Sequence, residues 1–335
     1  MIAGDGAGPE VIAEARKVVD ALGLDLAWNE LPWGTDHFHE HGAMMPPDAI
    51  EVARAHDAIL LGAVGHPSVP DHVTLWGLLL PLRQRLDLYA NLRPARLLDG
   101  VPSRLDGRPA VDMLFVRENT EGEYAGVGGR AHQGLPLEVG IETSVFTRAG
   151  VRRVVERAFA LAESRRSLVT SATKSNASRY GYVLWDEVVE EVHAAHPDVT
   201  VERVLVDALA ARMVSSPASL DVVVASNLFG DILTDVAAVL QGGMGMAASA
   251  SLGDERIAMF EPVHGSAPDI AGRGIANPLG AIWSAALMLD HLGETEASQR
   301  VMHAVEAVCR AGILTRDVGG SASTGSVGDA VAARV

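Results

Sequence analysis

Two aspartates one helical turn apart, Asp231 and Asp235, have the spacing of a cation site. On a helix, side chains at positions i and i+4 share a face with Cβ atoms about 6 Å apart, so two unpaired carboxylates there repel each other. The neighbours Ile232, Leu233 and Val236 predict a largely buried helix, where such a pair needs a cation. Oxygen-only ligation favours Mg²⁺ or Mn²⁺. The alternative is a helix-capping Asp231 beside an exposed Asp235.

A third acid, Asp207, stands between an apolar strand-like run at 201–206 and a helical run that follows it. It could simply cap that helix, because aspartate accepts hydrogen bonds from the free N–H groups at a helix start. The carboxyl end of a strand is also where α/β proteins place functional groups. Asp207 is therefore either a cap or a functional carboxylate.

Three arginines, Arg83, Arg93 and Arg117, are candidate carboxylate-binding groups. A guanidinium group binds a carboxylate through paired hydrogen bonds, so three that converge would hold a dicarboxylate. Taken singly, each is more often a surface ion-pair residue.

Lys174 and Tyr124 could move protons. Lys174 follows the strand-like run 167–172, and a partly desolvated lysine there could act as a general base. The phenol of Tyr124 could donate a proton. The alternatives are a solvent-facing lysine and an ordinary strand tyrosine.

The polar, turn-rich stretch 264–278 could wrap an adenosine, with Asp269 accepting hydrogen bonds from ribose hydroxyls. A carboxylate there repels a 2′-phosphate, which favours NAD over NADP. The glycine-rich turn Gly4–Glu10 is a different case, because a dinucleotide fingerprint needs glycine where this chain has Pro9. It predicts a tight turn with Pro9 in the first turn of a helix at 9–21.

Short apolar runs alternate with amphipathic helical segments along the chain, which predicts α/β architecture with buried strands. A length of 335 residues favours two domains. The expected strands are 58–64, 111–116, 167–172, 201–206 and 221–226, and the clearest helices are 150–163, 182–195 and 283–292.

The net charge of −16 and the absence of a Lys/Arg run argue against nucleic-acid binding. The single cysteine, Cys309, excludes an intrachain disulfide and predicts a reducing compartment. No apolar run reaches membrane-spanning length and no signal peptide is present, so we expect a cytoplasmic protein that does not enter membranes.

In order and type, these residues resemble the β-decarboxylating dehydrogenases, a family that includes isocitrate, 3-isopropylmalate, tartrate and D-malate dehydrogenases. The resemblance runs nearly end to end. It rests on GDGAGPE (4–10), NLRPAR (91–96), VRENTEGEYAG (116–126), TKSNA (173–177), VDALAARMV (206–214), SNLFGDILTD (226–235) and EPVHGSAPDIAGRGIANP (261–278).

The resemblance implies a non-Rossmann, isopropylmalate/isocitrate dehydrogenase-like α/β fold. Its large cofactor-binding domain would come from both chain ends, 1–94 and 242–335. A smaller central domain, 95–241, would carry the dimer interface and the metal aspartates. The resemblance also implies a homodimer with shared active sites.

The resemblance assigns a role to each candidate residue. Arg83, Arg93 and Arg117 match the arginines that hold the substrate carboxylates, and Tyr124 matches the tyrosine that protonates the enol. Lys174 matches the lysine near the 2-hydroxyl, which reaches in from the second subunit. Asp231 and Asp235 match metal ligands of one subunit, and Asp207 the ligand from its partner. The expected cofactor-loop residues are His264, Gly265, Ser266, Ala267, Asp269, Ile270 and Asn277.

The implied activity is NAD- and Mg²⁺- or Mn²⁺-dependent oxidation of a small malate-type 2-hydroxy dicarboxylate, with a K⁺ requirement left open. The segment 69–77 resembles the tartrate/D-malate branch, and a bulky Trp76 there would leave room only for hydrogen or hydroxyl at C3. We therefore expect D-malate conversion to pyruvate and CO₂, or tartrate oxidation. If Leu79 and Leu80 line an isopropyl pocket instead, the activity is that of 3-isopropylmalate dehydrogenase in leucine biosynthesis. A remote alternative, a non-catalytic regulatory subunit, is disfavoured because no catalytic or metal residue is lost.

Overall fold

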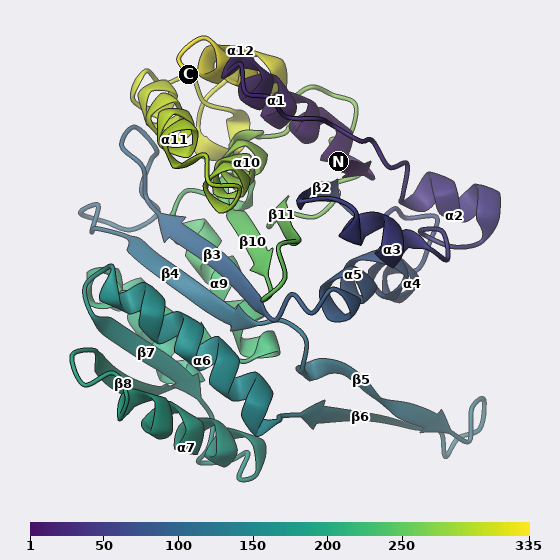
Figure 1. Ribbon diagram of the computed structural model, residues 1–335, viewed down its shortest axis with the longest axis vertical. Helices are drawn as coiled ribbons and strands as arrows, with labels where there is room; N and C mark the ends of the chain where they lie inside the picture. Colours follow the sequence, from purple (N-terminus) through teal and green to yellow (C-terminus); the bar gives the residue numbers. More distant parts are fainter. The chain divides into compact units, whose positions relative to one another are not determined.

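The computed structural model describes residues 1–335, and the chain divides into two compact units. The first unit comprises Met1–Leu88, Leu92–Val111 and Ala237–Val335, and the second comprises Tyr89–Asn91 and Asp112–Val236. The first unit is built from both chain ends (Figure 1).

The two units do not coincide with the expected domains 1–94 with 242–335 and 95–241, and the longest stretch that differs is 95–111, which lies in the first unit. The reason lies in packing, because Leu98 and Val101 are buried in the hydrophobic core of the first unit. Arg108 donates hydrogen bonds to the carbonyl oxygens of both residues and so closes this segment on itself.

The first unit contains strands in the order β1-β2-β11-β10-β3. Strand β1 pairs with β2 and β2 with β11 in parallel, whereas β10 and β11 are antiparallel. The bounds are β1 Ile2–Gly4, β2 Ala58–Ala63, β3 Ala90–Arg96, β10 Ala248–Leu252 and β11 Ala258–Pro262.

Helices cover both faces of these strands (Figure 1). Because side chains alternate along a strand, Leu60 and Phe260 enter one core cluster with α1 and α10, while Leu61 and Met259 enter another with α3 and α5. The helices of this unit are α1 Gly8–Ala21, α2 Thr35–His41, α3 Ala49–Arg54, α4 Asp71–Thr74, α5 Leu80–Arg85, α10 Leu279–His291, α11 Thr295–Arg310 and α12 Thr324–Ala332.

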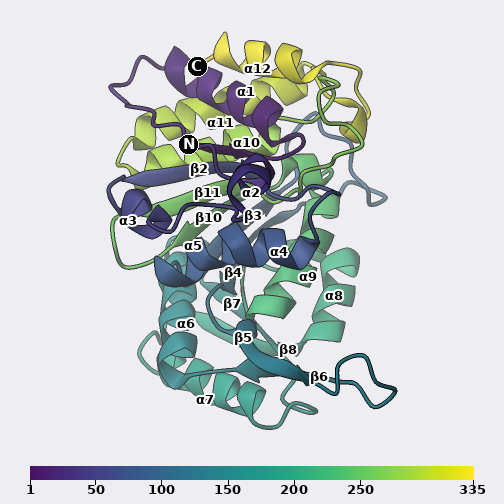
Figure 2. The same ribbon diagram turned by 90° about the vertical axis from the view of Figure 1, so that its right-hand side faces the viewer.

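The second unit contains parallel strands in the order β4-β9-β7-β8. Figure 2 shows α6 and α8 on opposite sides of these strands. The bounds are β4 Asp112–Glu118, β7 Leu168–Thr173, β8 Thr200–Leu205 and β9 Val222–Ala225, with α6 Arg148–Glu163, α7 Gly181–His193, α8 Val206–Ser215 and α9 Asn227–Leu240. Every strand expected from an apolar run is present.

A separate two-stranded ribbon, β5 (Gly122–Ala131) and β6 (Val139–Val145), extends from the second unit (Figure 1). Apolar side chains of both strands are exposed, including Val127 at 48% and Ile141 at 57%. In the other unit, burial raises the pKa of the Cys309 thiol to about 12, which leaves it unreactive inside α11. None of the helices combines the length and apolarity needed to cross a membrane.

Candidate active site

Arg117 is the centre of a polar cluster at the carboxyl end of β4. Its side chain is only 2% exposed, and Nε and Nη2 donate hydrogen bonds to Asn227 Oδ1 at 3.0 and 2.7 Å. Nη1 forms an ion pair with Asp231, and the Tyr124 hydroxyl donates to Asp231 Oδ2 at 3.2 Å. The Asn227 amide in turn donates to the Glu121 carbonyl at 3.0 Å. The strand end and the start of α9 therefore fix the guanidinium and the phenol together.

The phenol of Tyr124 is suited to donating a proton. Partial burial raises the pKa of Tyr124, and the negative charge of Asp231 raises it further. The neutral phenol is consequently the form present at physiological pH. A protonated phenol is what a proton donor requires, and the role itself stays a prediction.

The aspartates Asp231 and Asp235 lie one turn apart on α9, as the spacing predicts. Our expectation of a largely buried helix is wrong at Ile232, which is 55% exposed, although Leu233 is fully buried. The helix buries one face only, and Asp235 lies on the exposed side with Ile232. Both carboxylates can therefore reach a ligand from solvent.

The donor set on α9 fits a hard cation but does not complete its site. Two carboxylates on one helical face supply the oxygen ligands that Mg²⁺ and Mn²⁺ prefer. Within one chain, however, no group of three or more histidine, cysteine, aspartate or glutamate side chains gathers as a metal site. Asp207 thus does not join the α9 pair in the same chain.

Lys174 and Asp207 form a second cluster in this unit. Lys174 Nζ lies 2.5 Å from Asp207 Oδ1, with side chains 29% and 67% exposed. Asp207 lies in the first turn of α8, whose N-cap position is taken by Leu205. The hydrogen bond from Lys174 lowers the pKa of the Asp207 carboxyl. Both side chains reach solvent, Asp207 more fully than Lys174.

Two of the three candidate carboxylate-binding arginines, Arg83 and Arg93, lie in the first unit. Arg83 lies on α5 and pairs with Glu261 of β11 at 2.5 Å, and the two side chains are 6% and 9% exposed. Arg83 Nε is buried and has no hydrogen-bond partner, so the guanidinium retains a donor for a ligand. Arg93, on β3, is likewise buried at 7% exposure. These are the properties of an anion-binding group and not of surface ion-pair residues.

In the segment before Arg83, Trp76 is exposed, whereas Leu79 and Leu80 lie against or inside the core. Residues Leu75–Leu79 form one π-helical turn, a local geometry that is frequent at functional sites. Trp76 is 43% exposed, whereas Leu80 is 2% exposed and Leu79 packs against the core cluster of Leu78 and Leu82.

The stretch 264–277 contains an acceptor suited to a nucleotide base. His264 Nδ1 lies 2.9 Å from the Gly265 carbonyl and serves as the donor, while Nε2 is buried without a partner. Burial lowers the pKa of His264, so the ring is neutral and Nε2 can accept a hydrogen bond from a ligand. The exposed carboxylate of Asp269 is available for a ribose. These features fit an adenosine.

The other residues of the predicted cofactor loop contact neighbouring residues of the first unit. The Asn277 amide donates to Asp317 Oδ2 at 3.0 Å and its oxygen accepts from the Leu279 N–H at 3.0 Å. The Ser266 carbonyl accepts from the Ala7 N–H at 2.7 Å. Ala267 and Ile270 rest partly buried on the core of the unit, and Gly265 is exposed.

Three partners of the site were not singled out from sequence: Asn227 for Arg117, Glu261 for Arg83 and Asp317 for Asn277. Asn227 stands in the motif SNLFGDILTD, one helical turn before Asp231, and Glu261 opens the motif that contains His264. A polar side chain in the same motif as an expected ligand was the available signal. Asp317 had no such signal.

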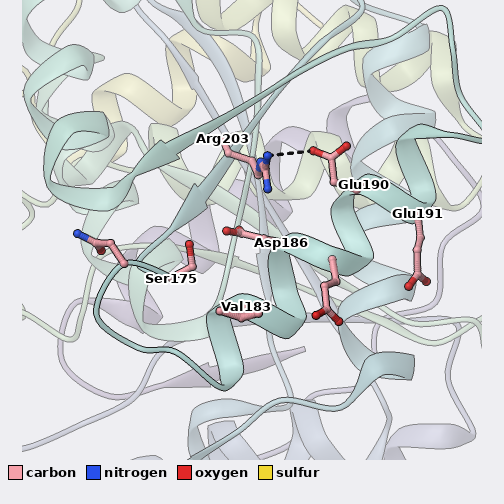
Figure 3. A pocket seen from close by; sticks show the side chains of 8 residues that line it. Ser175, Val183, Asp186, Glu190, Glu191 and Arg203 are labelled. Atoms are coloured by element: carbon pink, nitrogen blue, oxygen red, sulfur yellow. Dashed lines mark ion pairs between the residues drawn. The ribbon is translucent and has the colours of Figure 1, made fainter.

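A surface groove of about 630 Å³ lies along α7. Its lining includes Ser175 and Asn176, which follow Lys174 in sequence, but none of the predicted site residues. Figure 3 shows its lining, in which Arg203 forms an ion pair with Glu190 at 3.4 Å. Its acidic side chains include Asp186, Glu187 and Glu191. The groove contains none of the residues to which the sequence assigned chemistry.

Comparison with known proteins finds relatives that match nearly the whole chain. Residues 1–331 match the family model described as isocitrate/isopropylmalate dehydrogenase. A probable tartrate dehydrogenase/decarboxylase of Agrobacterium vitis is 52% identical over 98% of this chain and 95% of its own length. One from Bacillus subtilis (strain 168) is 48% identical over 100% and 96%.

Two further relatives widen the comparison. A 3-isopropylmalate dehydrogenase of Mycobacterium tuberculosis is 52% identical over 92% of both chains. The crystal structure of isocitrate dehydrogenase from Methylococcus capsulatus superposes with a TM-score of 0.92 at 36% identity, covering 99% of this chain and 97% of that one.

Proposed function

This chain belongs to the isocitrate/isopropylmalate dehydrogenase family as a β-decarboxylating dehydrogenase, and we propose that it oxidises D-malate or tartrate with NAD. The family uses NAD(P) and a divalent metal with small hydroxy-acid substrates. With D-malate, the products are pyruvate, CO₂ and NADH. One observation carries the choice of substrate. Trp76 is exposed just before the carboxylate-binding Arg83, while Leu80 is buried.

The chain's own residues bind the substrate and move its protons. Arg83, Arg93 and Arg117 hold the carboxylates. Lys174, through a water or a neighbouring group, removes the proton of the 2-hydroxyl, and the neutral phenol of Tyr124 returns a proton to the enol carbon after CO₂ leaves. The chemistry that the bound groups supply is hydride acceptance by the nicotinamide and polarisation of the ketone oxygen by the metal.

The cofactor preference rests on the exposed loop carboxylate. Asp269 offers acceptors to a ribose and repels a 2′-phosphate, so the proposal is NAD and not NADP. His264, Asn277 and the backbone of 265–270 would surround the adenosine. Charge reversal at Asp269 should weaken NAD use, and unchanged kinetics would refute its role.

We also propose that the active unit is a homodimer. Asp231 and Asp235 hold Mg²⁺ or Mn²⁺ from one protomer, and Asp207 with Lys174 enters from its partner. The support is that one chain gathers no three-ligand metal site, and that Lys174 and Asp207 stand together in the open. The free thiol of Cys309 agrees with a reducing, cytoplasmic location.

The second candidate is 3-isopropylmalate oxidation, favoured by the 52% identity to the mycobacterial 3-isopropylmalate dehydrogenase. It would require an apolar pocket, whereas Leu79 packs into the core. A substrate panel decides between the two. We would follow NADH formation with Mn²⁺ and K⁺ on D-malate, both tartrates, 3-isopropylmalate and isocitrate.

If D-malate or tartrate has the highest kcat/KM, the proposal stands. If 3-isopropylmalate has it, the leucine pocket is right and the role of Trp76 is wrong. Absence of turnover on every substrate would favour the regulatory-subunit alternative.

A further inference from the structure

The turn Gly4–Glu10, which the proposed mechanism leaves without a role, contacts the candidate cofactor loop at two points. Glu10, in the first turn of α1, accepts hydrogen bonds from two backbone amides of that loop. Its Oε1 accepts from the Gly272 N–H and its Oε2 from the Gly274 N–H, the latter at 3.0 Å. One carboxylate therefore ties the first helix to a segment more than 260 residues away in sequence.

The backbone of segment 272–274 turns toward the Glu10 carboxylate. Gly272 and Gly274 have φ of +71° and +63°, a left-handed backbone that side chains rarely adopt, and Arg273 between them does not. The N–H groups of Gly272 and Gly274 both meet the Glu10 carboxylate, whereas the Arg273 N–H between them bonds to the Ile270 carbonyl at 3.2 Å. The two left-handed glycines thus turn two amides of the segment toward one carboxylate of the chain itself.

A second contact holds the other end of the loop. The Ala7 N–H donates to the Ser266 carbonyl at 2.7 Å, and a Cβ on Gly6 would lie 2.0 Å from that same oxygen. The backbone of the turn thus fits directly against Ser266. Between these two contacts, the side chains of Pro268 and Asp269 are exposed and do not pack into the hydrophobic core.

We infer that Glu10 is a positioning residue for the dinucleotide, because it holds segment 272–274 and thereby fixes the preceding loop 264–270 that receives the adenosine. The inference rests on the proposed function, since it takes loop 264–270 as the adenosine site. Glu10 itself touches no substrate. Its effect reaches the ligand only through the backbone that carries His264 and Asp269.

The test uses Glu10→Gln in the full-length enzyme, with Glu296→Gln as the matched control. Both residues are acidic groups in the first turn of a helix, so both substitutions remove the same helix-dipole interaction. Only Glu10 bonds to the loop. Glutamine is close in size but has a single acceptor oxygen, so one of the two amides loses its partner.

We expect Glu10→Gln to raise the KM for NAD and the inhibition constant of ADP-ribose together by about tenfold, equivalent to about 1.4 kcal/mol. The kcat and the KM for the hydroxy acid should stay within about twofold, because the loop does not meet the reacting carbons. Glu10→Asp, which keeps the charge on a shorter chain, should restore part of the loss. Glu296→Gln should change neither constant.

A lower Tm with an unchanged ADP-ribose constant would show that Glu10 is structural only, and would overturn the inference. Failure of the proposed function looks different. If the wild type turns over no hydroxy acid, ADP-ribose binding measured by calorimetry still reports on Glu10. Equal affinity in wild type and Glu10→Gln would then overturn the inference independently.

Discussion

One ion pair of the candidate site in each unit, Arg83–Glu261 in the first and Lys174–Asp207 in the second, can be compared, and these two pairs differ in exposure and not in length. Arg83–Glu261 and Lys174–Asp207 both have a nitrogen–oxygen distance of 2.5 Å. The first pair is buried at 6% and 9% exposure, while the second is open at 29% and 67%. A buried charge that loses its partner is strongly destabilising, whereas an exposed pair contributes little to stability. The first pair therefore belongs to the folded framework, and the second is free to meet other groups.

The largest expected effect is on activity, at the open pair. Lys174→Met should lower kcat about 1,000-fold, because general-base catalysis is lost. The Tm should hardly change, since the pair is exposed. Steady-state kinetics and thermal unfolding measure both quantities. Lys17→Met is the natural control, because Lys17 is the only other lysine and has ion pairs of its own with Glu14 and Asp329. Substantial turnover by Lys174→Met would remove lysine from the mechanism.

The buried pair should show the opposite pattern, with a large effect on stability. Arg83→Met leaves Glu261 buried and unpaired, which should lower the free energy of unfolding by about 3–5 kcal/mol. The double variant Arg83→Met/Glu261→Gln removes both charges and should recover much of that loss. Urea unfolding at neutral pH measures each variant. If the double variant is no more stable than the single one, the pair is not what holds this part of the unit together.

Exchange between protomers would sharpen the contrast further. Heterodimers of Lys174→Ala and Asp231→Asn chains, isolated through two affinity tags, should regain about half of the wild-type activity per dimer, because one of the two shared sites is intact. Heterodimers of Lys174→Ala and Asp207→Asn are the control, since each site then lacks one group from the same donor protomer. Heterodimers as inactive as their parents would mean that Lys174 and Asp231 serve a site within one chain.

The comparison also shows what the sequence could and could not predict. The strands at 58–63 and 222–225 could be predicted, because a strand buried on both faces appears in the sequence as a run of consecutive apolar residues. The i, i+4 spacing placed Asp231 and Asp235 correctly on one helix. Periodicity does not say what covers a helix, and Ile232 proved exposed for that reason. The pairing of Arg117 with Asp231 joins residues 114 apart in sequence and depends on the fold.

Substrate choice should respond to the exposed side chain of the first unit. Trp76→Leu removes the bulk expected to limit the C3 substituent, and should raise kcat/KM for 3-isopropylmalate relative to D-malate about tenfold. Trp28→Leu, on the same unit, should leave the ratio unchanged. A ratio that does not move in Trp76→Leu would show that the indole packs away from the substrate.

The smallest expected effect is on the pH dependence of the KM for NAD, because protonating the buried His264 is unfavourable. Burial lowers the pKa of His264, opposed by its bond to the Gly265 carbonyl and by the charge of Asp317. Because the folded pKa lies below the ordinary value of about 6.5, the neutral ring contributes stability above that pH, and the contribution is lost as pH falls through the folded pKa. The KM for NAD should therefore stay flat from pH 8 to 6.5 and rise severalfold only below it. His264→Gln should abolish the rise and the exposed-site control His303→Gln should keep it, whereas a rise centred above pH 6.5 would show that a different group controls cofactor binding.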